Sequence, residues 1–422
     1  MIMWSISSLM ARNLKFYSVI IDRSLFFIIA TIFLFPFLIY LKEPGYNPYS
    51  ISELTILLIM LILLVLTNKQ RILLIPSSFT FTVLLYFMYQ IILALGSNSY
   101  LAAYNSIVLH DKYVILSFLT FNYINDKDEN FFLKAILFIG ILSICLGIPK
   151  IITTNIFYLD IGGYVRLNSI FPNPNMYGVY MLLVGLLAIV LYDKIVKYQY
   201  KAIYVVLIIL PTLISLVLTF SRRSWGLFIM SIIIYLLLKK GKKIMLVISM
   251  IVLILFSLLI VNYDVIVTRF MLSFDPNYAS NSARSTMFSA QLYVLSENIY
   301  SLIGGLGVGL FGPTASYFLS ANRLTIIDNY YLQLMLEYGF LGVIIYLSIF
   351  IITVLKGIKL LRSRALNSWE YNKVLMYIIL LSTLYIAGVV GSTPITFPLN
   401  MFQWIFIGLI LKNYSCHINR NT

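Results

Sequence analysis

The chain is a succession of long apolar runs separated by short polar segments, from about residue 24 to residue 261 and again from residue 329 onward. Each run is close to the roughly 17–25 residues that an α-helix needs to cross a bilayer. A transmembrane β-barrel would instead alternate apolar and polar residues over about ten positions, so the pattern excludes it. The twelve candidate spans are 24–41, 51–67, 72–95, 100–124, 131–148, 174–192, 202–220, 224–238, 244–261, 329–355, 374–391 and 398–411.

One polar stretch interrupts this pattern, because residues 262–328 carry Arg, Asp, Asn, Gly and Tyr in place of an apolar run. Within it we expect a helix from about Ser282 to Glu297, capped by Ser282 or Asn281, followed by a glycine-rich turn at 304–312. The predicted fold is an all-α polytopic membrane protein with about twelve transmembrane helices and one large exoplasmic loop containing short helices. The loop divides a single integral-membrane domain into segments 1–261, 262–328 and 329–422.

The fourth candidate span, 100–124, is unusual because His110, Asp111 and Lys112 lie near its middle. Charged side chains at that depth are costly in a bilayer and often mark a functional site. The sequence leaves two interpretations open. Either these residues form an internal ion pair, or the span is broken at that depth.

Composition agrees with a membrane protein, since 61% of the 422 residues are hydrophobic, 11% are charged and the mean hydropathy is +0.95. A soluble domain is about 45–50% apolar and about 25% charged. The net charge of +15 at first suggests a nucleic-acid partner. However, twelve crossings place 21 positive residues on one side and 8 on the other, so the positive-inside rule assigns both termini to the cytoplasm. The charge therefore reflects topology, and no nucleic-acid partner is expected.

The positive residues on the outer side differ in type from those on the inner side, because six of the eight are arginines. The eight are Lys42, Lys150, Arg166, Arg222, Arg223, Arg269, Arg284 and Arg323. The planar guanidinium group suits phosphate and carboxylate, which favours an anionic exoplasmic substrate. Arg222 and Arg223 occupy a tight turn at 219–225, so extension toward lipid headgroups is the alternative interpretation.

Several helix starts are readable from single residues. Asn173 is a candidate N-cap, with Pro174 at the first helical position. Arg284 would lie in the first turn of its helix, where the macrodipole disfavours a cation, so we infer that it meets a ligand or partner. Asp328 and Asn329 precede the span 329–355 and are candidate caps.

Asp328 is also the carboxylate best placed to act as a general base near the arginines, because Glu337 lies further into the span. The segment 307–312 matches G-x-G-x-x-G, but an exoplasmic loop offers no βαβ unit, so a turn for close packing is the better interpretation. We expect no metal site, since His110 and His417 lie at different depths without a carboxylate cluster. Cys145 and Cys416 lie on different levels, so no disulfide is expected, and the first apolar run lacks a signal-peptide cleavage site.

Four blocks of the sequence resemble the bacterial O-antigen polymerase and O-antigen ligase superfamily. TFSRRSWGLFIM (219–230) is similar to the T-x-S-R motif that opens a span in this family. SARSTMFSAQLYVLSENIYSLIGGLGVGLFG (282–312) and DNYYLQLMLEYGFLG (328–342) are similar to the exoplasmic helix with its glycine-rich turn and to the motif after it. RLNSIFPNPNMYG (166–178) resembles an earlier block.

The resemblance implies that Arg222 or Arg223, together with Arg284, contacts the pyrophosphate of an undecaprenyl-linked glycan, and that Arg166 is a further anion or sugar contact. Asn329 and Arg323 are additional candidate substrate contacts. Family ligases carry His before the Asn of the third block, whereas this chain has Asp328, which favours the polymerase branch.

The implied enzyme is a metal-independent inverting glycosyltransferase without a cofactor. It lies in the bacterial inner membrane and uses membrane-borne substrates, with a chain-length regulator and a flippase as possible partners. The alternatives are a ligase that transfers glycan to lipid A–core and a flippase for lipid-linked oligosaccharides. The large loop follows nine candidate spans without matched halves, which counts against a transporter.

Overall fold

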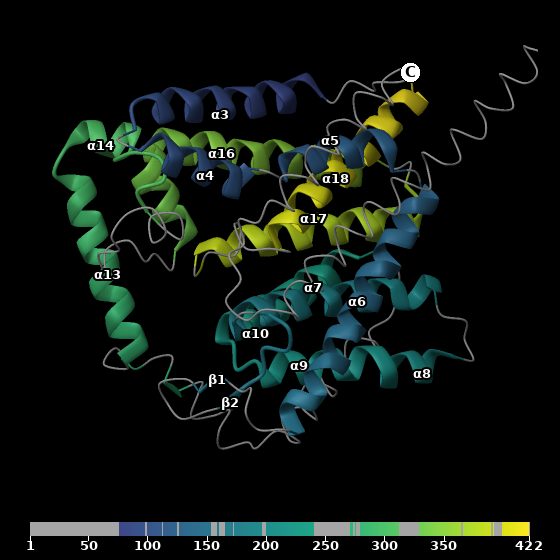
Figure 1. Ribbon diagram of the computed structural model, residues 1–422. Coiled ribbons are helices and arrows are strands. Elements are labelled where there is room, and N and C mark those ends of the chain that lie inside the picture. The colour runs from purple at the N-terminus through teal and green to yellow at the C-terminus, as the bar shows by residue number, and fades with distance from the viewer. Residues whose placement is uncertain are drawn as a thin grey trace, which may run out of the picture.

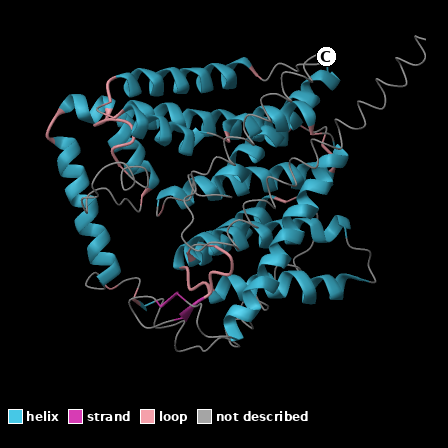
Figure 2. Ribbon diagram, in the orientation of Figure 1, coloured by secondary structure: helices cyan, strands magenta, loops and turns pink. Residues whose placement is uncertain are grey.

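In the computed structural model, the secondary structure of the described residues is helical, apart from one pair of two-residue strands (Figure 2). The structure describes residues 76–97, 99–111, 113–124, 126–152, 158–159, 165–171, 173–195, 200–239, 271–272, 275, 279–311, 329–363, 366–389, 391 and 399–421. The predicted spans 24–41, 51–67 and 244–261 lie outside these ranges. Helices occupy the other nine predicted spans.

The helices form two packed groups (Figure 1). The upper group in that view comprises α3 (Ser77–Leu95), α4 (Tyr100–Asp111), α5 (Val114–Tyr123), α16 (Tyr330–Arg362), α17 (Ser368–Val389) and α18 (Leu399–Asn421). The lower group comprises α6 (Asp126–Ile152), α7 (Pro174–Ile195), α8 (Lys201–Tyr204), the π-helical turn η2 (Val205–Ile209), α9 (Leu210–Leu218) and α10 (Arg222–Leu238). α17 joins the two groups, because it packs against α16 and α18 and also against α7 and α10.

Two helices and two strands complete the described chain. α13 (Ala279–Ser296) runs across one end of the bundle and leads into α14 (Ile299–Gly304) (Figure 1). The strands β1 (Tyr158–Leu159) and β2 (Val165–Arg166) pair antiparallel, with Tyr158 opposite Arg166.

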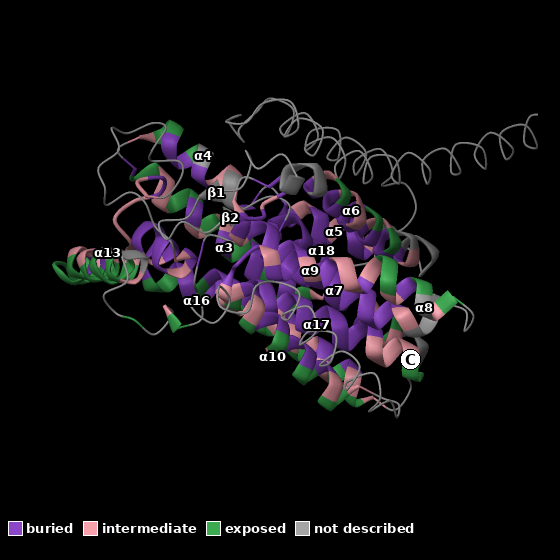
Figure 3. Ribbon diagram, turned by 90° about the horizontal axis from the view of Figure 1, so that it is seen from below, coloured by how far each residue is buried: buried purple, intermediate pink, exposed green. Residues whose placement is uncertain are grey.

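Among the described residues, four helices are long and apolar enough to cross a membrane. They are Ser77–Leu95, Pro174–Tyr192, Tyr330–Arg362 and Ser368–Val389. α7 and α18 are buried along most of their length, whereas α3 exposes large apolar side chains such as Phe81, Leu84 and Ile92 (Figure 3). Such an outward apolar face suits contact with lipid. The apolar helices agree with a membrane protein, while the count of twelve crossings stays a prediction.

Two helix starts, one at Pro174 and one near Ser282, were predicted from the sequence. Asn173 caps α7 as expected, because its Oδ1 accepts the Met176 backbone N–H at 2.8 Å and Pro174 is the first helical residue. The helix predicted within residues 262–328 exists, but it begins at Ala279 rather than at Ser282. Asn281 therefore lies inside the first turn instead of at the cap. Its Nδ2 donates to the carbonyls of Leu272 and Asp275 at 3.1 and 2.8 Å.

The span 100–124 is broken at the depth where its charged residues lie. α4 ends at Asp111 and α5 begins at Val114, so the predicted span 100–124 is divided between two short helices. This break confirms one of the two interpretations of the sequence. It leaves Asp111 at the end of a helix in the bundle interior.

The glycine-rich turn after α14 is a close-packing device, as the sequence predicts. Gly305, Gly307 and Gly309 have positive φ values of 82°, 132° and 78°. A Cβ on Gly305 would lie 2.5 Å from the Glu337 carbonyl oxygen, and one on Gly309 would lie 2.3 Å from that of Ala102. The turn thus packs against α16 and α4 without intervening side chains.

The part of α16 that faces the glycine-rich turn is kinked at Gly339, where φ is 68° and ψ is −177°. The kink interrupts the helical hydrogen bonds, and other elements bond the carbonyls beside it. The Leu306 backbone N–H donates to the Leu336 carbonyl at 2.7 Å, and the Tyr89 hydroxyl donates to the Tyr338 carbonyl at 2.8 Å. The kink therefore exposes backbone carbonyl groups of α16 against which the glycine-rich turn packs.

Alanine at Gly309 is expected to lower the free energy of unfolding by about 2 kcal/mol or more, because it adds both backbone strain and a steric clash. Gly226→Ala is the matched control, since a Cβ there meets nothing within 4 Å and α10 gains helix propensity. Thermal unfolding of the two purified variants measures the difference. Equal midpoints would contradict the packing role of the turn.

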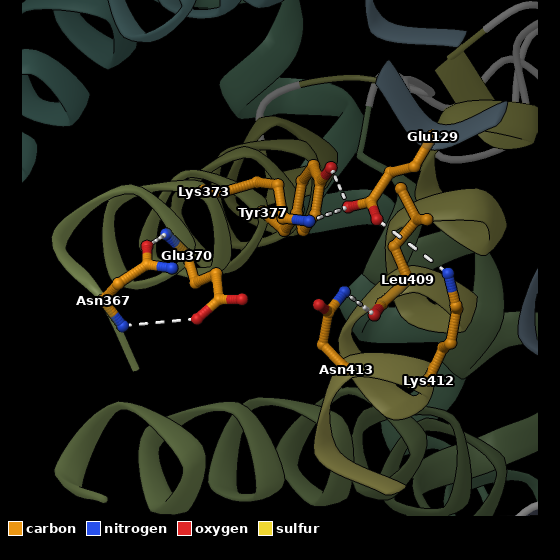
Figure 4. Close-up of polar contacts among 8 residues, drawn as sticks. All are labelled: Glu129, Asn367, Glu370, Lys373, Tyr377, Leu409, Lys412 and Asn413. Carbon is orange, nitrogen blue, oxygen red and sulfur yellow. Dashed lines mark hydrogen bonds and ion pairs between the residues drawn. The ribbon is translucent and has the colours of Figure 1, made fainter. Parts of the chain in front are cut away.

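A buried ion cluster joins α6, α17 and α18 at the opposite end of the bundle (Figure 4). Glu129, 1% exposed, lies 2.9 Å from Lys373 Nζ and 3.9 Å from Lys412 Nζ, and it accepts the Tyr377 hydroxyl at 2.5 Å. Beside it, Asn367 and Glu370 exchange hydrogen bonds of 2.9 and 3.2 Å in a capping box at the start of α17. The cluster brings together Lys373 and Lys412, which the charge pattern assigns to the same side of the membrane.

Candidate functional site

The turn between α9 and α10 presents the paired arginines. Phe220 in this turn has a φ of 48°, a left-handed conformation that costs free energy for a side-chain-bearing residue. Thr219 Oγ1 donates to the Leu216 carbonyl at 2.7 Å and accepts the Ser221 N–H at 3.2 Å. Ser221 Oγ and Ser224 Oγ lie 2.9 Å apart. These bonds hold the strained turn at the base of Arg222 and Arg223.

Arg166 fastens strand β2 to this turn. Its Nε donates to the Thr219 carbonyl at 2.9 Å and its Nη2 donates to Asn175 Oδ1 at 2.7 Å. The next residue, Leu167, donates its N–H to the Leu218 carbonyl at 2.9 Å. Because Arg166 is only 6% exposed, most of its fork faces protein groups.

Arg222 connects the turn to α13. Its Nη2 donates to Asn281 Oδ1, in the first turn of α13, at 3.3 Å. Arg222 is half-buried, and its Nη1 is a buried nitrogen. This contact brings two segments 59 residues apart to the same place.

Arg223 turns in another direction, toward the carboxyl end of α17. Its Nη1 donates to the Ala387 carbonyl at 3.1 Å, and a Cβ on Gly391 would lie 2.0 Å from the same nitrogen. A cation at a helix carboxyl end is favoured by the helix dipole. Arg223 therefore has a structural contact in addition to any role with a substrate.

Arg284 is exposed on α13, on the same face as Gln291 and Leu295, since positions i, i+7 and i+11 align on a helix. Gln291 and Leu295 are buried, and Leu295 packs with Leu332 and Leu336 of α16. α13 is therefore anchored at one end by Arg222 and at the other by α16. Arg284 lies between these anchors, on the side turned to the bundle.

Asn329 caps α16, because its Oδ1 accepts the backbone N–H groups of Tyr331 and Leu332 at 3.0 and 3.1 Å. This confirms the capping prediction for Asn329. Asp328 and Arg323 lie outside the described residues, so their roles as base and substrate contact stay predictions.

Sequence reasoning missed the part that Glu337 plays. Glu337 is fully buried and accepts hydrogen bonds from Ser106 Oγ at 2.7 Å, Gln333 Nε2 at 3.2 Å and the Gly309 N–H at 3.3 Å. It thereby ties the glycine-rich turn to α4 and α16. A single carboxylate inside an apolar run was the available signal, but the sequence does not reveal its partners.

Metal ligands are scarce in this region. Within the described ranges, no three His, Cys, Asp or Glu side chains gather closely enough to hold a metal ion. The described charged groups around α10 and α13 are mainly the guanidinium groups, which bind anions directly.

Comparison with known proteins does not assign a function to this chain. No family model matches the chain, and no curated protein matches it.

Proposed function

We propose that this protein is a polysaccharide polymerase of the bacterial inner membrane. It moves a growing glycan from undecaprenyl pyrophosphate onto the terminal sugar of a lipid-linked repeat unit at the exoplasmic face. The observation that supports it best is the placement of the arginines. Arg166 bonds the turn that carries Arg222, and Arg222 bonds the first turn of the helix that carries Arg284.

The chemistry requires a site that stabilises a pyrophosphate leaving group. The acceptor hydroxyl oxygen attacks the anomeric carbon while the bond from that carbon to the pyrophosphate oxygen breaks, so negative charge develops on the pyrophosphate. Fixed guanidinium groups stabilise this charge without a metal. Attack from the face opposite the pyrophosphate inverts the anomeric configuration.

The four arginines have different parts in this proposal. Arg222 and Arg284 hold the pyrophosphate, since one is half-buried and the other is exposed. Arg166 and Arg223 bond protein carbonyls and thereby position the turn, with a substrate contact as a second role. Asp328 accepts the proton of the acceptor hydroxyl. Asn329 and Arg323 contact the sugars or the anion.

The two ends of α17 support a two-sided arrangement. Ala387 meets Arg223 at one end, and Lys373 meets Glu129 near the other, about 21 Å away along the axis. In the proposed topology the arginine end is exoplasmic and the lysine end, with both termini, is cytoplasmic. About twelve crossings and one large exoplasmic loop complete it. Membrane lipid surrounds the bundle, and a chain-length regulator and a flippase are the proposed partners.

Deletion and complementation in the native host test this function. Cells lacking a polymerase are expected to show single repeats on lipid A–core in a gel of the cell-surface polysaccharide, and the full-length chain restores the ladder. Bare core with polymer retained on the carrier would identify a ligase instead. Bare core without exposed repeats would identify a flippase. Either of these last two patterns would refute the polymerase proposal.

A further inference from the structure

The break between α4 and α5 leaves a carboxyl group halfway along the predicted span 100–124. Asp111, at the last position of α4, is 4% exposed. Its Oδ2 accepts a hydrogen bond of 2.6 Å from Nε2 of Gln90, which is fully buried on α3. This pair lies in the bundle interior.

The groups that face Asp111 are neutral phenols and an amide. Tyr86 approaches from α3, together with Gln90, and Tyr330, Tyr338 and Tyr346 approach from α16. Tyr385 of α17 extends the cluster, because its ring lies 5.4 Å from that of Tyr346. α18 contributes Gln403, whose Nε2 donates to the Tyr346 hydroxyl at 2.7 Å.

No described cation compensates this carboxyl group. The other carboxyl on the facing part of α16, Glu337, accepts its bonds from Ser106, Gln333 and Gly309. Among the side chains that the structure describes, no Lys, Arg or His forms an ion pair with Asp111. An ionised carboxylate buried among neutral groups is strongly disfavoured.

Asp111, Gln90 and Tyr86 each carry one buried polar atom that has no hydrogen-bond partner among the described residues. These atoms are Asp111 Oδ1, Gln90 Oε1 and the Tyr86 hydroxyl oxygen. Two of them, on Asp111 and Gln90, belong to side chains that already share one hydrogen bond. A single proton on Asp111 Oδ1 satisfies both, because it is donated to Gln90 Oε1 while Gln90 Nε2 donates to Oδ2. The result is a closed pair of hydrogen bonds between a carboxylic acid and an amide.

We propose that Asp111 is a proton-binding site within the membrane, in which the neutral carboxylic acid pairs with Gln90 through two hydrogen bonds. The proton comes from water and replaces the counter-ion that a buried carboxylate would need. A divalent cation is not proposed as the ligand, because no three His, Cys, Asp or Glu side chains gather around a metal position within the described ranges. The inference does not depend on the polymerase assignment.

Infrared spectroscopy of the full-length chain, reconstituted in vesicles of phosphatidylethanolamine and phosphatidylglycerol, tests the proposal. At pH 7 the wild type is expected to show the C=O stretch of one protonated carboxylic acid that Asp111→Asn lacks. Asp275→Asn is the control, since Asp275 is exposed and its replacement should leave the acid band unchanged. Gln90→Leu should keep the acid band and shift it to higher frequency, because both hydrogen bonds of the pair are lost.

Three results would overturn the proposal. Asp111→Asn could remove a carboxylate band instead of the acid band, which would show an ionised Asp111. The acid band could appear only after sodium is removed, which would identify a sodium site. Gln90→Leu could leave the band unshifted, which would disprove the pair even if Asp111→Asn failed to fold.

Discussion

Alanine in place of Arg222 or Arg284 is expected to reduce polymer synthesis by about 10²–10³-fold, because each variant removes a fixed donor to the developing charge on pyrophosphate. Cells with either variant should show mostly single repeats on lipid A–core. The measurement is the gel profile of cells that carry the variant as their only copy, at matched membrane levels of the protein.

The controls separate charge from geometry and from folding. Arg222→Lys keeps the charge but loses the planar fork, so it should restore only a small part of the activity. Arg362→Ala changes an exposed arginine at the other end of α16 and should leave the ladder unchanged. Normal polymer length in both Arg222→Ala and Arg284→Ala would refute the assignment of the site.

Replacing Glu129 by glutamine is expected to destabilise the folded protein by about 3–5 kcal/mol, because it leaves a buried lysine without its counter-charge. Lys373 is 7% exposed and its Nζ lies 2.9 Å from Glu129, so the ammonium group cannot reach water without local rearrangement. The variant keeps the shape of the side chain, and thermal unfolding in detergent measures the loss.

A pair of further variants checks this explanation. Glu370→Gln, at the partly exposed capping box on the same end of α17, should cost no more than about 1 kcal/mol. Adding Lys373→Met to Glu129→Gln should recover much of the lost stability, since no unpaired charge then remains at that position. An unfolding midpoint for Glu129→Gln equal to that of the wild type would show that the cluster does not hold the three helices together.

The sequence predicted those features that depend on local chemistry. Long apolar runs indicate helices regardless of their neighbours, and Asn173 followed by Pro174 marks a helix start through bonds within one turn. Likewise, a run of glycines indicates a close backbone approach, although it does not say to what. The break after Asp111 was one of two interpretations, because charge alone disfavours a continuous apolar crossing at that point.

Features that depend on distant residues could not be read from the sequence. Nothing in the residues near Glu129 identifies Lys373, 244 positions later, as its partner. The same holds for Arg166. This buried side chain donates a hydrogen bond to the carbonyl of Thr219, 53 positions later in the sequence. The predicted start of α13 was wrong because the Asn281 side chain does not cap the helix. It donates to the Leu272 carbonyl, before the helix, and accepts a hydrogen bond from Arg222.

The π-helical turn η2 sets the direction in which the arginine turn points. It lies between α8 and α9 and is followed by Pro211, which has no N–H to continue the normal bonding pattern. Tyr204, before it, donates to the Ala188 carbonyl of α7 at 3.1 Å, while Leu216, after it, is buried against the same core. A π-helical turn contains one residue more than the α-helical turn it replaces. Without that residue, Tyr204 and Leu216 would be rotated relative to each other by about 100° around the helix axis and could not both face the same core. The direction in which the Arg222 side chain points therefore depends on the one extra residue in the π-helical turn, which lies more than ten positions before it in the sequence.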